Sequence, residues 1–129
     1  HAVVIGRSAV VGRPAAMLLL REDAAVTVCH SRTPDTAALT RQADIIITAA
    51  GAAGSLTAAH VRPGQTIIDV SANWDAAKNT IVGDADFDAA ASIVDAITPV
   101  PGGVGAVTSA VLMRHVVQAA ERTLEGGNL

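Results

Sequence analysis

Residues suited to anion binding lie in a loop near the start of the sequence. The loop reads Gly6-Arg7-Ser8-Ala9-Val10-Val11-Gly12-Arg13-Pro14 and joins a short apolar run to a segment with helical spacing. Backbone N–H groups and the helix dipole can hold an anion at such a junction, so the loop predicts phosphate binding. Its spacing departs from the pattern GxGxxG, because Ser8 replaces the second glycine and Gly12 comes one residue late. The alternative is an ordinary turn between a strand and a helix.

A second polar group follows the next apolar run and bears on the choice of cofactor. The segment Cys29-His30-Ser31-Arg32-Thr33 contains no acidic residue, whereas NAD-binding domains usually carry Asp or Glu here for the ribose 2′-hydroxyl. Ser31 and Arg32 offer a hydroxyl and a guanidinium instead, which suit a 2′-phosphate. The segment therefore favours NADP. The alternative is a solvated turn in which Ser31 or Thr33 caps the following helix.

The third candidate loop, residues 98–105, is rich in proline and glycine. It reads Thr98-Pro99-Val100-Pro101-Gly102-Gly103-Val104-Gly105. The prolines fix the entry of the chain, and the glycines are free to adopt positive φ. Such a loop can bring bare backbone close to a flat ligand; the alternative is a rigid turn.

The remaining reactive residue types do not form a catalytic or metal-binding pattern. Cys29 has no partner thiol and is expected to be a small buried hydrophobe. The histidines lack metal-ligand spacing, so no metal site is predicted. Asp84, Asp86 and Asp88 alternate without the pattern of a calcium loop and predict a solvated turn. Asp69 ends an apolar run and is expected to accept bonds from loop N–H groups.

The elements that must position these loops alternate between strands and helices. Apolar runs predict strands over residues 2–5, 25–29, 44–48, 66–70 and 92–97. Helices or helical turns are expected at 10–20, 34–42, 57–60, 84–91 and 106–124, the last one long and amphipathic. Residues 71–80 are expected to be irregular, with a brief extra strand at 81–83 as an option. This alternation predicts a Rossmann-like, doubly wound α/β fold: a mainly parallel sheet with helices on both faces and ligands at the carboxyl ends of the strands.

Composition limits the partners of this domain. Half of the 129 residues are hydrophobic, 16% are charged and the formal net charge is −3. That length fits one domain with a core, and the charge gives no attraction to nucleic acid or to an anionic membrane. One cysteine and no secretory signal predict a cytoplasmic location. Because His1 leads at once into an apolar run, the chain is expected to be a piece of a longer protein.

Six motifs in this order carry a family resemblance. They are GRSxxVGRP, VTVCHSRT, ADIIITAAG, VRPGQTIIDV, VGDADF and ITPVPGGVG, the last followed by Thr108. Over residues 2 to about 122 the sequence resembles the cofactor-binding domain of the methylenetetrahydrofolate dehydrogenase/cyclohydrolase family. Members of this family oxidise 5,10-methylenetetrahydrofolate with NADP and hydrolyse the methenyl product to 10-formyltetrahydrofolate.

The resemblance implies roles for particular residues. Gly6, Arg7 and Ser8 would bind cofactor phosphates, and Ser31 the 2′-phosphate. Ala72 would contact the nicotinamide half of the cofactor, and Thr98 would also bind the cofactor. The edge of the folate pocket would be formed by Pro101, Gly102, Gly103 and Val104.

The resemblance also implies what residues 1–129 lack. The family's catalytic Tyr and Lys belong to a preceding domain, and Lys78 matches no catalytic position, so no residue here is assigned a catalytic role. The isolated chain is therefore expected to be inactive, and the resemblance implies a homodimer. Two departures bear on substrate fit: Ser71-Ala72-Asn73 replaces Gly-Ile-Asn, and Ala106-Val107 replaces Pro-Met. The rival hypothesis is a Rossmann-like nucleotide-binding or regulatory module without catalysis.

Overall fold

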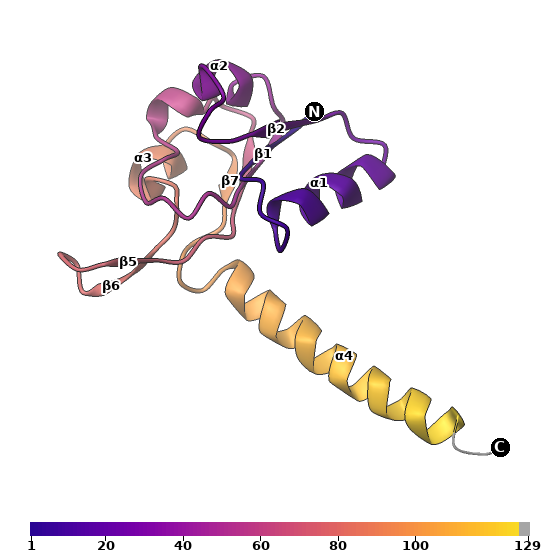
Figure 1. Ribbon diagram of the computed structural model, residues 1–129. Coiled ribbons are helices and arrows are strands. Elements are labelled where there is room, and N and C mark those ends of the chain that lie inside the picture. Colours follow the sequence, from indigo (N-terminus) through magenta and orange to yellow (C-terminus); the bar gives the residue numbers. More distant parts are fainter. Residues whose placement is uncertain (127–129) are drawn as a thin grey trace.

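The fold is built on a five-stranded sheet, seen in a computed structural model that describes residues 1–126 and the side chains of residues 1–124. Its strands are β1 (Ala2–Ile5), β2 (Val26–Cys29), β3 (Ile45–Thr48), β4 (Thr66–Asp69) and β7 (Ala96–Ile97). They are all parallel and lie in the order β2-β1-β3-β4-β7. The predicted doubly wound α/β fold is confirmed (Figure 1).

The core lies mainly on one face of the central strands, because alternate residues of β3 and β4 are buried there while Ile45, on the other face, stays exposed. All four residues of β1 are buried, and Val3, Ile46 and Ile67 are fully so. Cys29 belongs to the same buried cluster, as expected for a small hydrophobe. Burial raises the pKa of its thiol, which keeps it protonated at neutral pH.

Short helices cover the two faces of the sheet. Helix α1 (Gly12–Arg21) lies on one side, and α2 (Thr36–Thr40), η1 (Ala58–His60) and α3 (Phe87–Ala91) lie on the other (Figure 1). Asp35 caps α2 by accepting from the N–H of Ala38 at 3.0 Å, and Asp86 caps α3 in the same way. The alternative in which Ser31 or Thr33 caps α2 is therefore wrong.

Residues 71–80 are not irregular as predicted. They contribute to an antiparallel hairpin formed by β5 (Asn73–Asp75) and β6 (Thr80–Val82). The Asp75 carboxylate accepts from two N–H groups of the turn, and Asn79 adopts a positive φ of 51°. Polar residues that favour turns thus join two three-residue strands. The last predicted strand, 92–97, is reduced to the two residues of β7 because α3 and its closing turn occupy the preceding positions.

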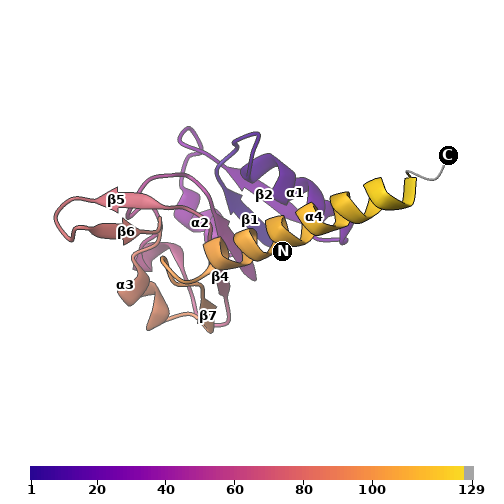
Figure 2. The ribbon, with the colours of Figure 1, turned by 90° about the horizontal axis from the view of Figure 1, so that it is seen from below.

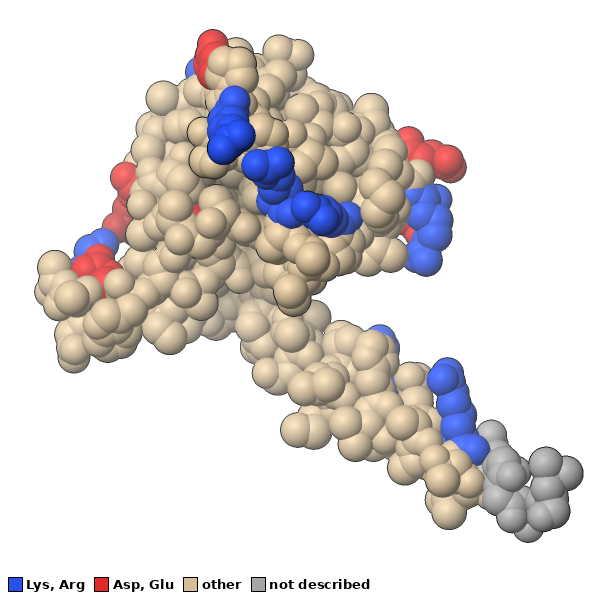
Figure 3. Space-filling model, in the orientation of Figure 1, with Lys and Arg blue, Asp and Glu red and all other residues tan. Residues whose placement is uncertain are grey.

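Helix α4 (Val104–Gly126) begins two residues earlier than predicted and projects away from the sheet (Figures 1 and 2). Every side chain from 112 to 124 is exposed, including Met113 at 66%. Figure 3 shows that most of its visible surface carries no charge. Its exposed large apolar residues are Val107, Leu112, Met113, Val116, Val117 and Leu124.

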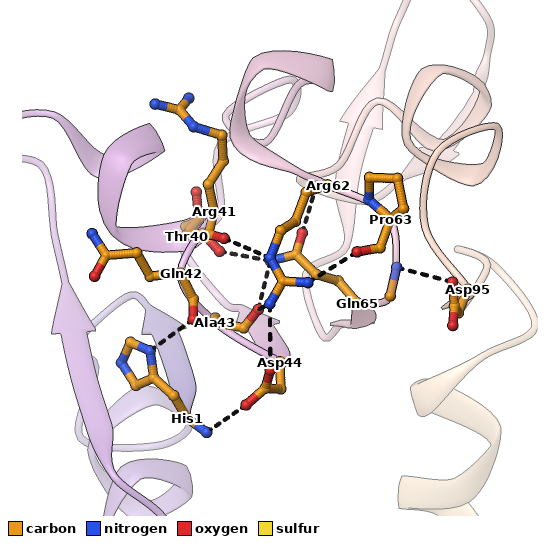
Figure 4. Close-up of polar contacts among 11 residues, drawn as sticks. His1, Thr40, Arg41, Gln42, Ala43, Asp44, Arg62, Pro63, Gln65 and Asp95 are labelled. Carbon is orange, nitrogen blue, oxygen red and sulfur yellow. Dashed lines mark hydrogen bonds and ion pairs between the residues drawn. The ribbon is translucent and has the colours of Figure 1, made fainter.

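A network of long polar side chains closes the amino edge of the sheet (Figure 4). Arg62 donates to the carbonyls of Arg41 and Ala43 at 2.7 and 2.9 Å and to Asp44 at 3.3 Å. The amine of His1 reaches the other oxygen of Asp44 at 2.8 Å. The hydrogen bond and charge of this amine, with a further contribution from Arg62, lower the pKa of the Asp44 carboxyl. This edge is opposite to the predicted site.

Candidate functional site

A cavity of about 450 Å³ opens at the carboxyl edge of the sheet, between the ends of β1 and β3. The chain passes from β1 to β2 on one side and returns to β3 on the other, so strand order reverses at this point. Doubly wound sheets bind their ligands at such a switch point. The cavity brings together the predicted residues Gly6, Arg7, Ser8 and Ser31, and adds His30, Ala50 and Ala52.

Two glycines give the β1–α1 loop its shape. Gly6 has φ +117°, and a Cβ there would collide with the carbonyl of Ala49. A Cβ on Gly12 would collide with the carbonyl of Gly6. The first glycine therefore permits the turn and the second permits close packing of α1 on β1.

Ser8 stands where the usual pattern has its second glycine, and its hydrogen bonds organise the loop. Its hydroxyl accepts from the N–H groups of Val11 and Gly12 at 3.1 and 3.3 Å, so it caps α1 from within the loop. Its carbonyl accepts from Arg13 at 3.0 Å. Because the first-turn N–H groups are bonded inside the loop, the exposed guanidinium of Arg7 is the group best placed to add positive charge to the cavity.

The turn after β2 is held by Thr33 and His30. The Thr33 hydroxyl accepts from the N–H of His30 at 3.0 Å, and the His30 ring accepts from the N–H of Arg32 at 3.1 Å. This leaves Ser31 on the cavity wall, whereas Arg32 is exposed beside the cavity and does not line it.

A second cavity, of about 270 Å³, lies further along the same edge. It brings Ala72 together with the predicted residues Pro101, Gly102, Gly103 and Val104. Thr98 lines neither this cavity nor the first. Its hydroxyl accepts from the N–H of Asp69 at 2.9 Å and so continues the pairing of β4 with β7.

The glycines of the Pro/Gly loop differ in what they do. Gly102 has φ +99°, which fits the prediction. Gly103 lacks a positive φ, and its small size is needed because a Cβ would meet the carbonyl of Pro99. Gly105 lies inside α4 with open space around its Cβ position, so the predicted need for glycine there is wrong.

The prediction that Asp84 belongs to a solvated turn is wrong. Asp84 is 0% exposed, and its carboxylate accepts hydrogen bonds from donors at the end of β3 and in the segments that follow β3 and β4. Burial by itself would raise its pKa, but the bonds from Ser71, Asn73, Thr48 and the N–H of Ala50 together bring the pKa below the ordinary value. The signal for this burial was weak: Gly83 and Ala85 on either side are small enough for close packing.

Asp69 does what the sequence predicted. It is 2% exposed and accepts from the N–H groups of Ser71 and Ala85 at 3.1 and 2.8 Å. Burial raises its pKa, and the nearby charge of Asp84 adds to the rise, although the backbone bonds oppose it.

Within residues 1–126, no helix is long and apolar enough to cross a membrane. In that same described part of the chain, no three His, Cys, Asp or Glu residues are grouped so as to hold a metal ion.

The reversed strand order, the glycine turn and the cavities at the carboxyl edge define a class: a doubly wound dinucleotide-binding domain. The sequence matches the family described as tetrahydrofolate dehydrogenase/cyclohydrolase, NAD(P)-binding domain, over residues 1–124, and the chain belongs to this family. The resemblance found in the motifs is thereby confirmed.

Individual relatives agree with this assignment. The bifunctional protein FolD of Parafrankia sp. is 57% identical over 93% of the chain, and the chain covers 43% of that relative. The crystal structure of the FolD methylenetetrahydrofolate dehydrogenase/cyclohydrolase from Campylobacter jejuni has a TM-score of 0.90 at 45% identity, with 95% of this chain and 43% of that one covered. The Trypanosoma brucei enzyme, complexed with NADP cofactor and inhibitor, has a TM-score of 0.87 at 39% identity, with coverage of 95% and 44%. The chain thus spans under half the length of these relatives.

Proposed function

We propose that the chain is the NADP-binding domain of a methylenetetrahydrofolate dehydrogenase/cyclohydrolase. The observation that carries this proposal is the cavity at the β1/β3 switch point, lined by Gly6, Arg7, Ser8 and Ser31. The steric need for glycine at position 6 leaves backbone bare beside the cavity, and Arg7 supplies a cation for phosphate. No acid lies at the end of β2 to repel a 2′-phosphate, and Ser31 with Arg32 offers donors to it.

The second cavity is proposed to serve the reacting half of the cofactor and the folate. Ala72 would lie against the nicotinamide, and the backbone of Pro101, Gly102, Gly103 and Val104 would form an edge of the folate pocket. Thr98, which pairs β7 with β4, would hold the strand end from which this loop begins. Bound NADP supplies the hydride acceptor for oxidation of 5,10-methylenetetrahydrofolate. The chain would hold the two ligands in the correct relative position. Groups outside residues 1–129 would carry out the hydrolysis that yields 10-formyltetrahydrofolate.

Catalysis is proposed to need a second domain. Neither cavity wall carries a lysine or tyrosine for acid–base work. The apolar side chains on α4, such as Met113 and Val117, are exposed and would be covered when that domain packs on the helix. The isolated chain is therefore expected to be inactive.

The proposed assembly is a homodimer. Trp74 and Ile81 on the hairpin are 65% and 42% exposed, and an exposed apolar hairpin supports pairing with a second copy. A cytoplasmic location remains a prediction, supported by the one thiol, Cys29, which is buried and reduced.

Titration calorimetry of the chain with NADP and with NAD tests the cofactor assignment. We expect NADP to bind at least about tenfold more tightly, since one charge-assisted contact to the 2′-phosphate is worth roughly 1.5–3 kcal/mol. Equal affinities would contradict the 2′-phosphate site, and binding of neither cofactor would favour a module that does not use NADP.

A further inference from the structure

The carboxylate of Asp84 joins two segments that are far apart in the sequence. Its Oδ2 accepts four hydrogen bonds, from the hydroxyls of Thr48 and Ser71 at 2.9 and 2.7 Å and from the N–H groups of Ala50 and Gly51 at 2.7 and 3.2 Å. Its Oδ1 accepts two, from the N–H of Ala52 at 2.7 Å and from the amide of Asn73 at 3.0 Å. Thr48 ends β3 and residues 50–52 follow it, and residues 71–73 follow β4. One side chain thus fixes the exits of two adjacent strands.

These two segments form walls of different cavities. Ala50 and Ala52 line the cavity that holds Gly6, Arg7 and Ser31. Ser71 and Ala72 line the cavity that holds the Pro/Gly loop. The N–H of Gly51 is shared between Asp84 and the Ser71 hydroxyl, at 3.2 Å each, and so ties the walls directly.

The backbone around Asp84 is itself held in place. Its carbonyl accepts from the N–H of Leu56 at 3.3 Å, and the N–H of Asp86 donates to the Leu56 carbonyl at 2.9 Å. Gly83 packs so closely on the Asp69 carboxylate that a Cβ would collide with it. A carboxylate anchored in this way fixes the position of its donors instead of following them.

We propose that Asp84 is a positioning residue that sets the two cavities in register, so that one dinucleotide can occupy both. Asp84 lines neither cavity, and bonds from the protein fill its oxygens, so it does not touch the cofactor or move a proton. This inference rests on the proposed function, because it takes NADP as the ligand that spans both cavities.

The test compares variants that loosen one wall or disturb both. Asn73→Ala removes one of the two bonds that Asp84 receives from residues 71–73 and leaves the bonds from Ser71 and from residues 50–52 in place. Asp84→Asn keeps the shape of the side chain but turns an NH₂ group toward the donors, which disturbs both walls. Asp88→Asn is the matched control, because this exposed acid in α3 undergoes the same change of charge.

The readouts are the melting temperature and the affinities of the 129-residue chain for NADP and for adenosine 2′,5′-bisphosphate, which represents the adenosine half alone. We expect Asn73→Ala to weaken NADP binding about three- to tenfold and bisphosphate binding less than about twofold. Asp84→Asn should weaken both ligands by about tenfold or more, and Asp88→Asn neither. A general loss of structure would lower both affinities together, so the split in Asn73→Ala distinguishes positioning from folding.

The failures are separable. If the unaltered chain binds neither ligand, the proposed function is wrong and the inference falls with it. If the unaltered chain binds both, two results overturn the inference alone: Asn73→Ala binding NADP as tightly as the unaltered chain, or losing both ligands by one factor. Because Asn73→Ala removes a single partly buried bond, it decides the matter even if Asp84→Asn fails to fold.

Discussion

Two aspartates at opposite edges of the sheet are stabilised by different means. Asp84, at the carboxyl edge, is fully buried and is surrounded by neutral donors: hydroxyls, an amide and backbone N–H groups. Asp44, at the amino edge, has a side chain 67% exposed and faces the guanidinium of Arg62 and, in the 129-residue chain, the amine of His1. Both carboxyls have a lowered pKa, in the first case from short-range dipoles that outweigh burial and in the second from hydrogen bonds and charge.

The difference matters for function because the two means impose different precision. Bonds from backbone N–H groups hold the loops that carry them directly, and buried contacts are screened much less by salt than exposed ones. Long side chains in water hold their partners loosely and contribute little stability as exposed ion pairs. Asp84, at the edge proposed to bind a ligand, makes the first kind of contact, and Asp44, at the remote edge, makes the second.

The largest effect is expected from neutralising each aspartate in turn. Asp84→Asn should lower the free energy of unfolding by about 2–4 kcal/mol, because buried donors lose a charged acceptor. Asp44→Asn should cost far less, since its charge is solvated. Urea unfolding monitored by circular dichroism measures both. Comparable losses at the two sites would show that burial and neutral donors do not distinguish the edges.

The next effect tests the close backbone packing of the carboxyl edge. Gly103→Val should lower the free energy of unfolding by about 1–3 kcal/mol, because its Cβ meets the Pro99 carbonyl and the backbone must move. Gly105→Val is the control, as the Cβ position there is open. Thermal unfolding of the two variants gives the comparison. If Gly103→Val has the same melting temperature as the unaltered chain, the loop is not packed against Pro99.

Much of the carboxyl edge could be predicted from the sequence, for a physical reason. Short apolar runs ending at Gly6 or at Asp69 predict strand ends, and in a parallel sheet all those ends meet at one edge. The prediction therefore brought Gly6, Ser8 and Ser31 together without any long-range information. Asp69 was also predictable, since it bonds to nearby loop groups.

Asp84 and α4 could not be predicted in the same way. The partners of Asp84 begin 36 residues earlier in the chain, at Thr48, so its local sequence resembles a solvated turn. The apolar residues of α4 predict a helix with a buried face, but periodicity does not say which surface covers that face. In the structure the sheet does not cover it. Of the hairpin, β6 overlaps the optional strand at 81–83, whereas β5 was missed because strands of three residues are too short to show alternation.

A smaller effect separates two arginines, one at each edge. Arg7→Ala should weaken NADP binding about tenfold and leave the melting temperature unchanged, because Arg7 is exposed on the cavity wall. Arg62→Ala should do the reverse, since Arg62 bonds the carbonyls of Arg41 and Ala43 far from the cavity. Calorimetric titration with NADP and NAD is paired with thermal unfolding. A loss of NADP affinity in Arg62→Ala would mean that the edges are not independent.

The smallest effect is the dependence of stability on pH, and its sign differs between Asp84 and Asp69. The pKa of Asp84 is lower in the folded state, so its contribution is full above the ordinary carboxyl pKa of about 4 and is lost as the pH falls through the folded value. The pKa of Asp69 is raised in the folded state, so its contribution is largest below about pH 4 and declines as the pH rises through the folded value. Asp84→Asn should therefore flatten only the acid side of the stability profile, and Asp69→Asn only the side above pH 4. Urea unfolding from about pH 3 to 6 follows both.

Added salt should reduce the acid-side contribution of Asp44 and leave that of Asp84 in place, because screening acts on exposed charges. Equal sensitivity of the two to salt would place Asp84 in contact with solvent and would remove the contrast between the edges.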